Sequence, residues 1–101
     1  MNVAPAISGT SVVVAAKDQV SSDLGDEVAI LNLKNETYYG LNSVAARVWQ
    51  LIRTPRTVRE VWEAVAAEYD VEPDRCERDV LTLLQKLADA GLVDVANERP
   101  R

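Results

Sequence analysis

The sequence predicts an α+β domain that is winged-helix-like in proportion, with a three-stranded antiparallel β-sheet followed by three α-helices. Three observations predict it. Runs with strand-like composition occur before residue 42, apolar residues at helical spacing follow that point, and the two patterns do not alternate. Strands and helices that are segregated along the chain are typical of an α+β architecture.

The size and composition fit one small folded domain. The chain has 101 residues, of which 48% are hydrophobic and 27% are charged, and these values are ordinary for a globular protein. We expect the domain at residues 10–95, a flexible N-terminal tail at 1–9 and a flexible C-terminal tail at 96–101. Within the domain, residues 92–95 are expected to be a short apolar tail.

Three segments have the composition of β-strands. Ser11 to Ala16 is rich in valine, Glu27 to Leu33 is apolar on both faces, and Thr37 to Leu41 contains two tyrosines. The stretch from Ser21 to Asp26 contains a glycine and is expected to be a turn or loop.

The second and third strands are expected to form a tight hairpin. Asn35 and Glu36 would be its loop, because asparagine tolerates the positive φ that such a turn needs, and Leu33 would then pair with Tyr38. The two faces of the hairpin follow from this register, with Leu31, Leu33 and Tyr38 on one and Ile30, Asn32 and Tyr39 on the other.

Each of the three helices has a predicted start. Asn42 is a suitable N-cap for the first helix. Thr57 caps the second, and Glu60 completes a capping box with it. Pro73 suits the first turn of the third helix, which is expected to stop at Gly91.

The composition argues against catalysis. The chain has no histidine, so the most common general base and metal ligand at neutral pH is missing. Cys76, the single cysteine, has carboxylates nearby in sequence that would raise its thiol pKa. The four glycines are isolated, so no glycine-rich phosphate loop exists. We therefore expect no enzyme activity, no metal and no cofactor.

The chain is also expected to be cytoplasmic. Its one cysteine cannot form an internal disulfide, and no apolar stretch has the length of a signal core or of a membrane helix. The net charge of −5 disfavours contact with an anionic membrane or with nucleic acid.

DNA binding is an alternative function, because winged-helix-like proportions are compatible with it. The third helix would enter the major groove, but it is net negative and would be repelled by phosphates. Four arginines lie in a stretch free of acids and are interpreted as a solvated surface rather than a docking patch: Arg47, Arg53, Arg56 and Arg59.

The strand from Thr37 to Leu41 is expected at an edge of the sheet. Proteins usually blunt such an edge with lysine, proline or a bulge, and this strand has no lysine or proline. Gly40 would let another backbone come close, so a guest peptide could join the sheet here. A simpler interpretation is that Tyr38 and Tyr39 pack the hairpin onto the first helix. A third possibility is a structural subunit that dimerises through this edge strand.

The run AILNLKNETYYGLNSVAARVWQLI, followed by TVREVWEAVAAEYDVEPDRCERDVLTLLQKLADAGLV, resembles the PqqD-like family. Members of this family are the precursor-peptide recognition elements of ribosomal peptide (RiPP) biosynthesis. The chain looks most like the stand-alone version found in lasso-peptide clusters. The resemblance covers about residues 12–95, and its most specific part is YYGLN leading into VW.

The resemblance implies a non-catalytic adaptor that binds the leader segment of a precursor peptide by β-strand addition. The leader would lie antiparallel to the third strand, in the groove between that strand and the third helix. The adaptor would deliver the leader to a transglutaminase-like leader peptidase, before a lasso cyclase closes the product. The peptide-binding residues carried over to this chain are Leu31, Leu33, Thr37, Tyr38, Tyr39, Gly40, Asp79, Val80, Leu83, Leu84 and Leu87.

Overall fold

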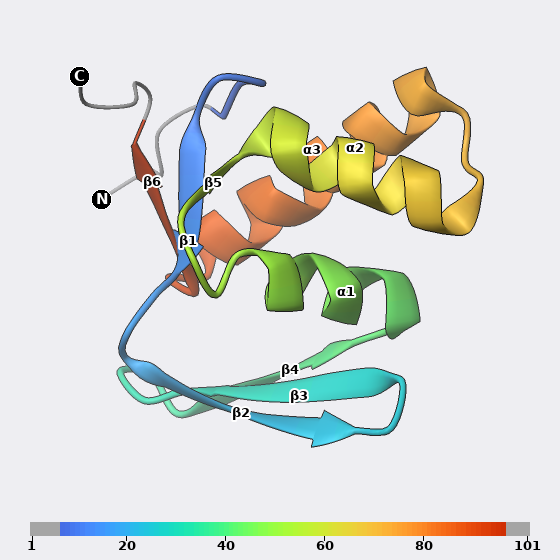
Figure 1. Ribbon diagram of the computed structural model, residues 1–101. Helices are drawn as coiled ribbons and strands as arrows, with labels where there is room; N and C mark the ends of the chain where they lie inside the picture. Colours follow the sequence, from blue (N-terminus) through green and yellow to red (C-terminus); the bar gives the residue numbers. More distant parts are fainter. Residues whose placement is uncertain (1–6, 97–101) are drawn as a thin grey trace.

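The computed structural model of the protein describes residues 7–96 and confirms the α+β class (Figure 1). One antiparallel sheet contains, in spatial order, β2 (Gln19–Leu24), β3 (Glu27–Asn32) and β4 (Thr37–Leu41). The second sheet has β1 (Val12–Ala15) at its centre, between β5 (Arg56–Thr57) and β6 (Val93–Ala96). The helices are α1 (Ser43–Leu51), α2 (Val58–Tyr69) and α3 (Pro73–Asp89).

The prediction of a turn or loop at residues 21–26 is wrong, because most of this segment belongs to β2. The sequence of this strand is polar and lacks the alternation that predicts burial on one face. It is a strand because every residue from Gln19 to Leu24 pairs with β3. Only Gly25, at φ +73°, and Asp26 turn the chain between the two strands.

The second sheet was not predicted at all. The segment expected to be a short apolar tail forms most of β6, which pairs with β1 from Val12↔Ala96 to Ala15↔Val93. The first predicted strand is therefore confirmed as a strand, but it belongs to this second sheet. Of the two expected tails, residues 1–6 and 97–101 lie outside the described residues. Ile7 packs against the core, so folded contacts extend beyond the expected boundary at residue 10.

The hairpin of β3 and β4 has a four-residue connection rather than the expected two. Leu31, not Leu33, pairs with Tyr38, and Glu36 rather than Asn35 takes the positive φ of 56°. The register is thus wrong by two residues. Because side chains alternate with a period of two, the strand residues still share the faces that were predicted.

The predicted helix starts are confirmed. Asn42 Oδ1 accepts a hydrogen bond from the N–H of Ala45 at 3.0 Å, and Thr57 forms the capping box with Glu60. Pro73 opens α3, and the chain leaves that helix at Gly91 with φ +76°.

Helix α1 lies between the β2–β3–β4 sheet and the other two helices (Figure 1). Its residues Val48 and Trp49 are fully buried, as are Ile30 from the inner face of the sheet and Val61 from α2. Burial of these apolar side chains is the main force that holds the sheet on the helices.

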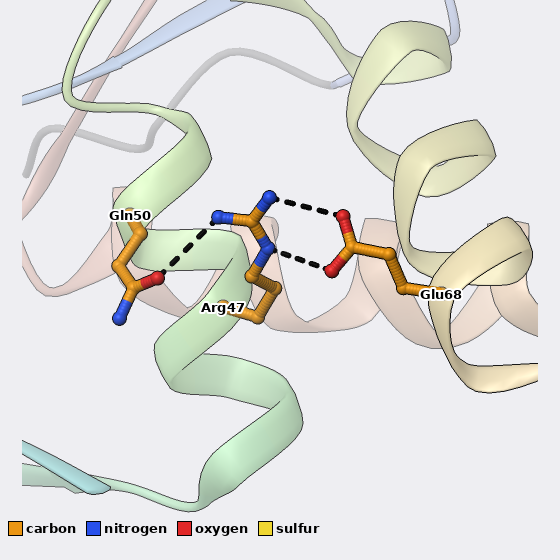
Figure 2. Close-up of polar contacts among 3 residues, drawn as sticks. All are labelled: Arg47, Gln50 and Glu68. Atoms are coloured by element: carbon orange, nitrogen blue, oxygen red, sulfur yellow. Dashed lines mark hydrogen bonds and ion pairs between the residues drawn. The ribbon is translucent and has the colours of Figure 1, made fainter. Parts of the chain in front are cut away.

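Arg47 of α1 and Glu68 of α2 join two of the helices through a bidentate ion pair (Figure 2). Arg47 Nε donates to Glu68 Oε1 at 2.8 Å, and its terminal nitrogen donates to Oε2 at 3.0 Å. These hydrogen bonds lower the pKa of the Glu68 carboxyl and raise the pKa of Arg47. The pair is partly exposed, so it orients the helices more than it stabilises them.

Asn32, at the end of β3, joins the sheet to the end of α3. Its side chain is buried, and Nδ2 donates to the carbonyl of Ala90 at 2.8 Å while Oδ1 accepts from the N–H of Lys34 at 2.9 Å. A buried polar side chain must satisfy its hydrogen bonds, and these two contacts do so.

Replacing Asn32 with alanine is expected to lower the free energy of unfolding by about 1–3 kcal/mol, because it removes both hydrogen bonds from a buried position. Urea denaturation measures this loss. Asn35→Ala is the control, since Asn35 makes its contacts at an exposed position, and it should cost clearly less. An equal loss for both variants would contradict the role of the buried contacts.

The Arg47–Glu68 pair predicts a pH-dependent stability difference. Because the folded pKa of Glu68 is lowered, its contribution is present above the unfolded pKa of about 4.3 and is lost as the pH falls through the folded pKa. Wild type should therefore exceed Glu68→Gln in urea midpoint at pH 7, and the two midpoints should converge at pH 2–3. A difference that does not change with pH would show that the ion pair is not its source.

Candidate functional site

Strand β4 has one unpaired edge. It pairs with β3 on one side, and within residues 7–96 no other strand pairs with it. Alternate N–H and C=O groups of the strand therefore point away from the sheet. The predicted edge position of Thr37 to Leu41 is confirmed.

The two tyrosines of β4 lie on opposite faces of the sheet. Tyr39 is half-buried on the inner face and packs against the core, as the packing interpretation expects. Tyr38 is 74% exposed on the outer face, so it does not serve that packing. At Gly40 no atom lies within 4 Å of the position that a Cβ would occupy, so the outer face of the sheet is open at this residue.

Helix α3 runs past β4 in the opposite direction. At one end, the Asn32–Ala90 hydrogen bond brings the end of α3 to the β3–β4 connection, where β4 begins. At the other end, Asn42, which follows β4, lines the same cavity as Asp79 and Leu83 of α3. The two ends of β4 therefore lie near α3, on the same side of the molecule.

This cavity has a volume of about 700 Å³ and opens to solvent where the three helices approach one another. Its wall residues come from the start of α1, the end of α2, the following link and the first half of α3. They are Asn42, Val44, Ala45, Val48, Val65, Asp70, Val71, Glu72, Arg75, Cys76, Asp79, Val80 and Leu83. We call this cavity the helix-end groove.

Three of the predicted peptide-binding residues, Asp79, Val80 and Leu83, line the helix-end groove. Two others on α3 do not: Leu84 is fully buried in the core, and Leu87 is 4% exposed. Four more of the predicted residues belong to the open strand β4: Thr37, Tyr38, Tyr39 and Gly40. The last two, Leu31 and Leu33, belong to β3 and to the connection after it.

Leu31 and Leu33 lie away from the helix-end groove. Leu31 stands next to Tyr38 across the β3–β4 ladder, on the outer face of the sheet. Leu33 lies in the connection after β3 and is 52% exposed. Neither residue lines the groove.

Sequence reasoning missed the contribution of α1 and α2 to the groove. Val44, Ala45 and Val48 of α1 and Val65 of α2 have the helical spacing that is typical of a core-facing apolar stripe. Helical spacing predicts that such residues face inward, but it does not predict that the ends of three helices leave a space between them.

Cys76 lines the groove as a small apolar wall residue. Its burial raises the pKa of the thiol, and the charge of Asp79 raises it further. Its Sγ also donates to the carbonyl of Trp62 at 3.4 Å. A neutral thiol in this setting is a poor nucleophile.

No group of three or more potential metal ligands occurs within residues 7–96. No helix in that part of the chain is both long and apolar enough to span a membrane.

The four arginines considered for DNA binding all have partners within the chain. Arg47 pairs with Glu68, Arg53 lies 3.7 Å from Asp23, and Arg59 lies 3.4 Å from Glu63. Arg56 Nε donates to the carbonyl of Leu51. These contacts agree with a solvated surface rather than a phosphate-binding patch.

Comparisons with known proteins place these features in a family. Residues 27–93 match the family described as coenzyme PQQ synthesis protein D (PqqD). No curated protein matches the chain. TbiB1 in complex with the TbiA(beta) leader peptide is a similar solved structure, with 34% identity and a TM-score of 0.76, covering 80% of this chain and 94% of that one.

Two other solved structures share the fold at 22% identity. A lasso peptide synthetase B1 complexed with the leader peptide has a TM-score of 0.72, with 81% of this chain and 96% of that one covered. The PqqD truncation of Methylobacterium extorquens PqqCD, a stand-alone RiPP recognition element, has a TM-score of 0.73, with 88% and 95% covered.

Proposed function

The chain belongs to the PqqD family, and on this premise we propose that it is a non-catalytic recognition element that binds the leader segment of a ribosomally made precursor peptide. The observation that carries the proposal is the open edge of β4 beside the helix-end groove. TbiB1, with a leader peptide bound, is the similar protein that supports it most directly.

Binding would occur by strand addition. The leader would lie antiparallel to β4, so that its backbone satisfies the unpaired groups of the edge. Its side chains would point alternately to the inner side, where α3 lies, and to the outer face beside Tyr38. Since β4 ends at Leu41, the N-terminal end of the leader would pass next to Asn42 and the groove.

The size of the contact is consistent with moderate affinity. Each ladder hydrogen bond contributes about 1 kcal/mol net, and each buried leader side chain contributes about 1.5–3 kcal/mol. After the cost of ordering the peptide, a Kd between about 10 nM and 10 μM is expected.

The protein itself would break no bonds. The chain has no histidine, and its single thiol is buried with a raised pKa. Its proposed role is delivery: it holds the leader close to a transglutaminase-like leader peptidase, and a cyclase then closes the lasso. Holding substrate and enzyme together raises their effective concentration.

Neither rival function has comparable support. DNA binding would require a net positive charge on α3, but that helix carries four acids against three bases. Dimerisation through β4 would use the same edge as the leader, so a bound peptide would compete with it.

A matched pair of proline variants tests the edge. Gly40 of β4 and Ser21 of β2 both lie on edge strands. Leu33 donates its N–H to the carbonyl of Asp18 on the β2 side, so by alternation Ala29 bonds toward β2, and Gly40, its partner on β4, turns its N–H to the open edge. Ser21, which is opposite Ile30, likewise turns its N–H away from β3. Gly40→Pro is expected to abolish leader binding, because proline lacks the N–H and blocks close approach, whereas Ser21→Pro should keep it. Isothermal titration calorimetry measures binding of the leader peptide encoded by a precursor gene next to the gene for this chain. Circular dichroism checks the fold of both variants.

The opposite pattern would place the leader on β2 and refute the proposed edge. Equal affinity for both folded variants would refute strand addition. N-methylation of alternate leader residues provides the same test from the side of the peptide, since it removes guest donors without changing the protein.

The delivery role predicts that this chain accelerates leader cleavage by its partner peptidase. At substrate concentrations below the peptidase's own KM, adding the chain should raise the cleavage rate at least about tenfold, and Gly40→Pro should not. Chromatography of the cleaved precursor measures the rate. A peptidase that is equally fast without the chain would leave leader binding intact but exclude delivery.

A further inference from the structure

The helix-end groove combines an apolar floor with a negative rim. Its floor contains valine, alanine and leucine side chains together with the neutral Cys76. Its charged wall residues are Asp70, Glu72 and Asp79 against a single arginine, Arg75. An occupant must therefore bring apolar surface for the floor and positive charge for the rim.

The negative charge of the rim is not neutralised by the rest of the described chain. Arg75 lies 3.8 Å from Asp79, and both side chains are more than 70% exposed, so this contact is weak. Within residues 7–96, no ion pair joins Asp70 or Glu72 to a basic side chain. The excess charge at the groove has the same sign as the net charge of −5, which attracts a basic peptide from a distance.

The position of the groove fixes which part of a bound leader reaches it. Asn42, which follows directly after β4, forms one wall. A strand antiparallel to β4 has its N-terminal end at this point. The leader residues that meet the groove are thus those just before the segment that pairs with β4.

We propose that the groove selects leaders that carry a lysine or arginine next to an apolar residue, immediately N-terminal to the strand-forming segment. Asp70, Glu72 and Asp79 are the specificity-determining residues for this charge. The inference rests on the proposed leader binding and adds to it the chemical class and the position of the recognised side chains.

The test uses a displayed library of random twelve-residue peptides, selected on the full chain and on two variants. The neutral-rim variant is Asp70→Asn, Glu72→Gln, Asp79→Asn. These changes keep the shape of the rim. They should also leave the fold intact, because Glu72 makes no side-chain cap for α3 and asparagine tolerates the positive φ of Asp70. The control variant is Asp26→Asn, Glu36→Gln, Asp94→Asn, which changes the net charge equally at residues that do not line the groove.

Peptides selected by wild type and by the control should be enriched in lysine or arginine beside an apolar residue, and the neutral-rim pool should lose this excess. For one selected peptide, a change of the basic residue to glutamate should weaken binding to wild type about tenfold at low salt, about threefold at 0.5 M salt, and less than about twofold in the neutral-rim variant. N-methyl groups that weaken binding should lie C-terminal to the basic residue.

A wild-type pool without this excess, or an excess that the neutral-rim variant keeps, overturns the charge selection. N-methyl effects on the N-terminal side overturn the position. The leader-binding function fails separately, if the selected peptides bind Gly40→Pro as well as wild type. Both fail if no peptide is selected.

Discussion

The unpaired edge of β4 is the constraint on which the rest of this structure depends. An edge strand that exposes its backbone groups is normally a hazard, because it pairs with any available strand. Here the strand is held firmly on its other side by five pairings with β3, and Leu41 and half-buried Tyr39 anchor it to the core. The sheet therefore presents a rigid template, and binding would cost little reorganisation of the protein.

Helix α3 is fixed near both ends of that template. Its C-terminal end is tied to β3 through Asn32, while its N-terminal half stands at the groove. Leu84 belongs to the core, and Leu83, one position earlier, lines the groove. Because consecutive residues on a helix differ by about 100° in direction, one apolar arc serves both purposes.

The sequence predicts those parts of the fold that local chemistry determines. Asn42, Thr57, Pro73 and Gly91 mark helix ends because each satisfies a local backbone requirement. The faces of the β3–β4 hairpin were correct even with a register error of two, since alternation is insensitive to such a shift. Strand β2 was missed because main-chain pairing with β3, rather than burial of an apolar face, orders its residues, and β6 was missed because its partner β1 lies about 80 residues away.

The same distinction explains the site. The edge strand was predictable because composition identifies it, and three residues on one wall of the groove, Asp79, Val80 and Leu83, were expected because the family resemblance carries them over to this chain. The other walls were not, because they depend on the angle between helices. The link from Asp70 to Glu72 sets that angle. Asp70 turns the chain at φ 53° and Pro73 starts α3, so Asp70 and Glu72 lie at the rim of the groove, while Val71 packs against the core. Three carboxylates meet at the groove because a polar link and the exposed first turns of a helix are where acidic residues are well tolerated. The exposed link and first turns of α3, where acidic residues are well tolerated, are thereby also the segments that can discriminate between leader peptides of different charge.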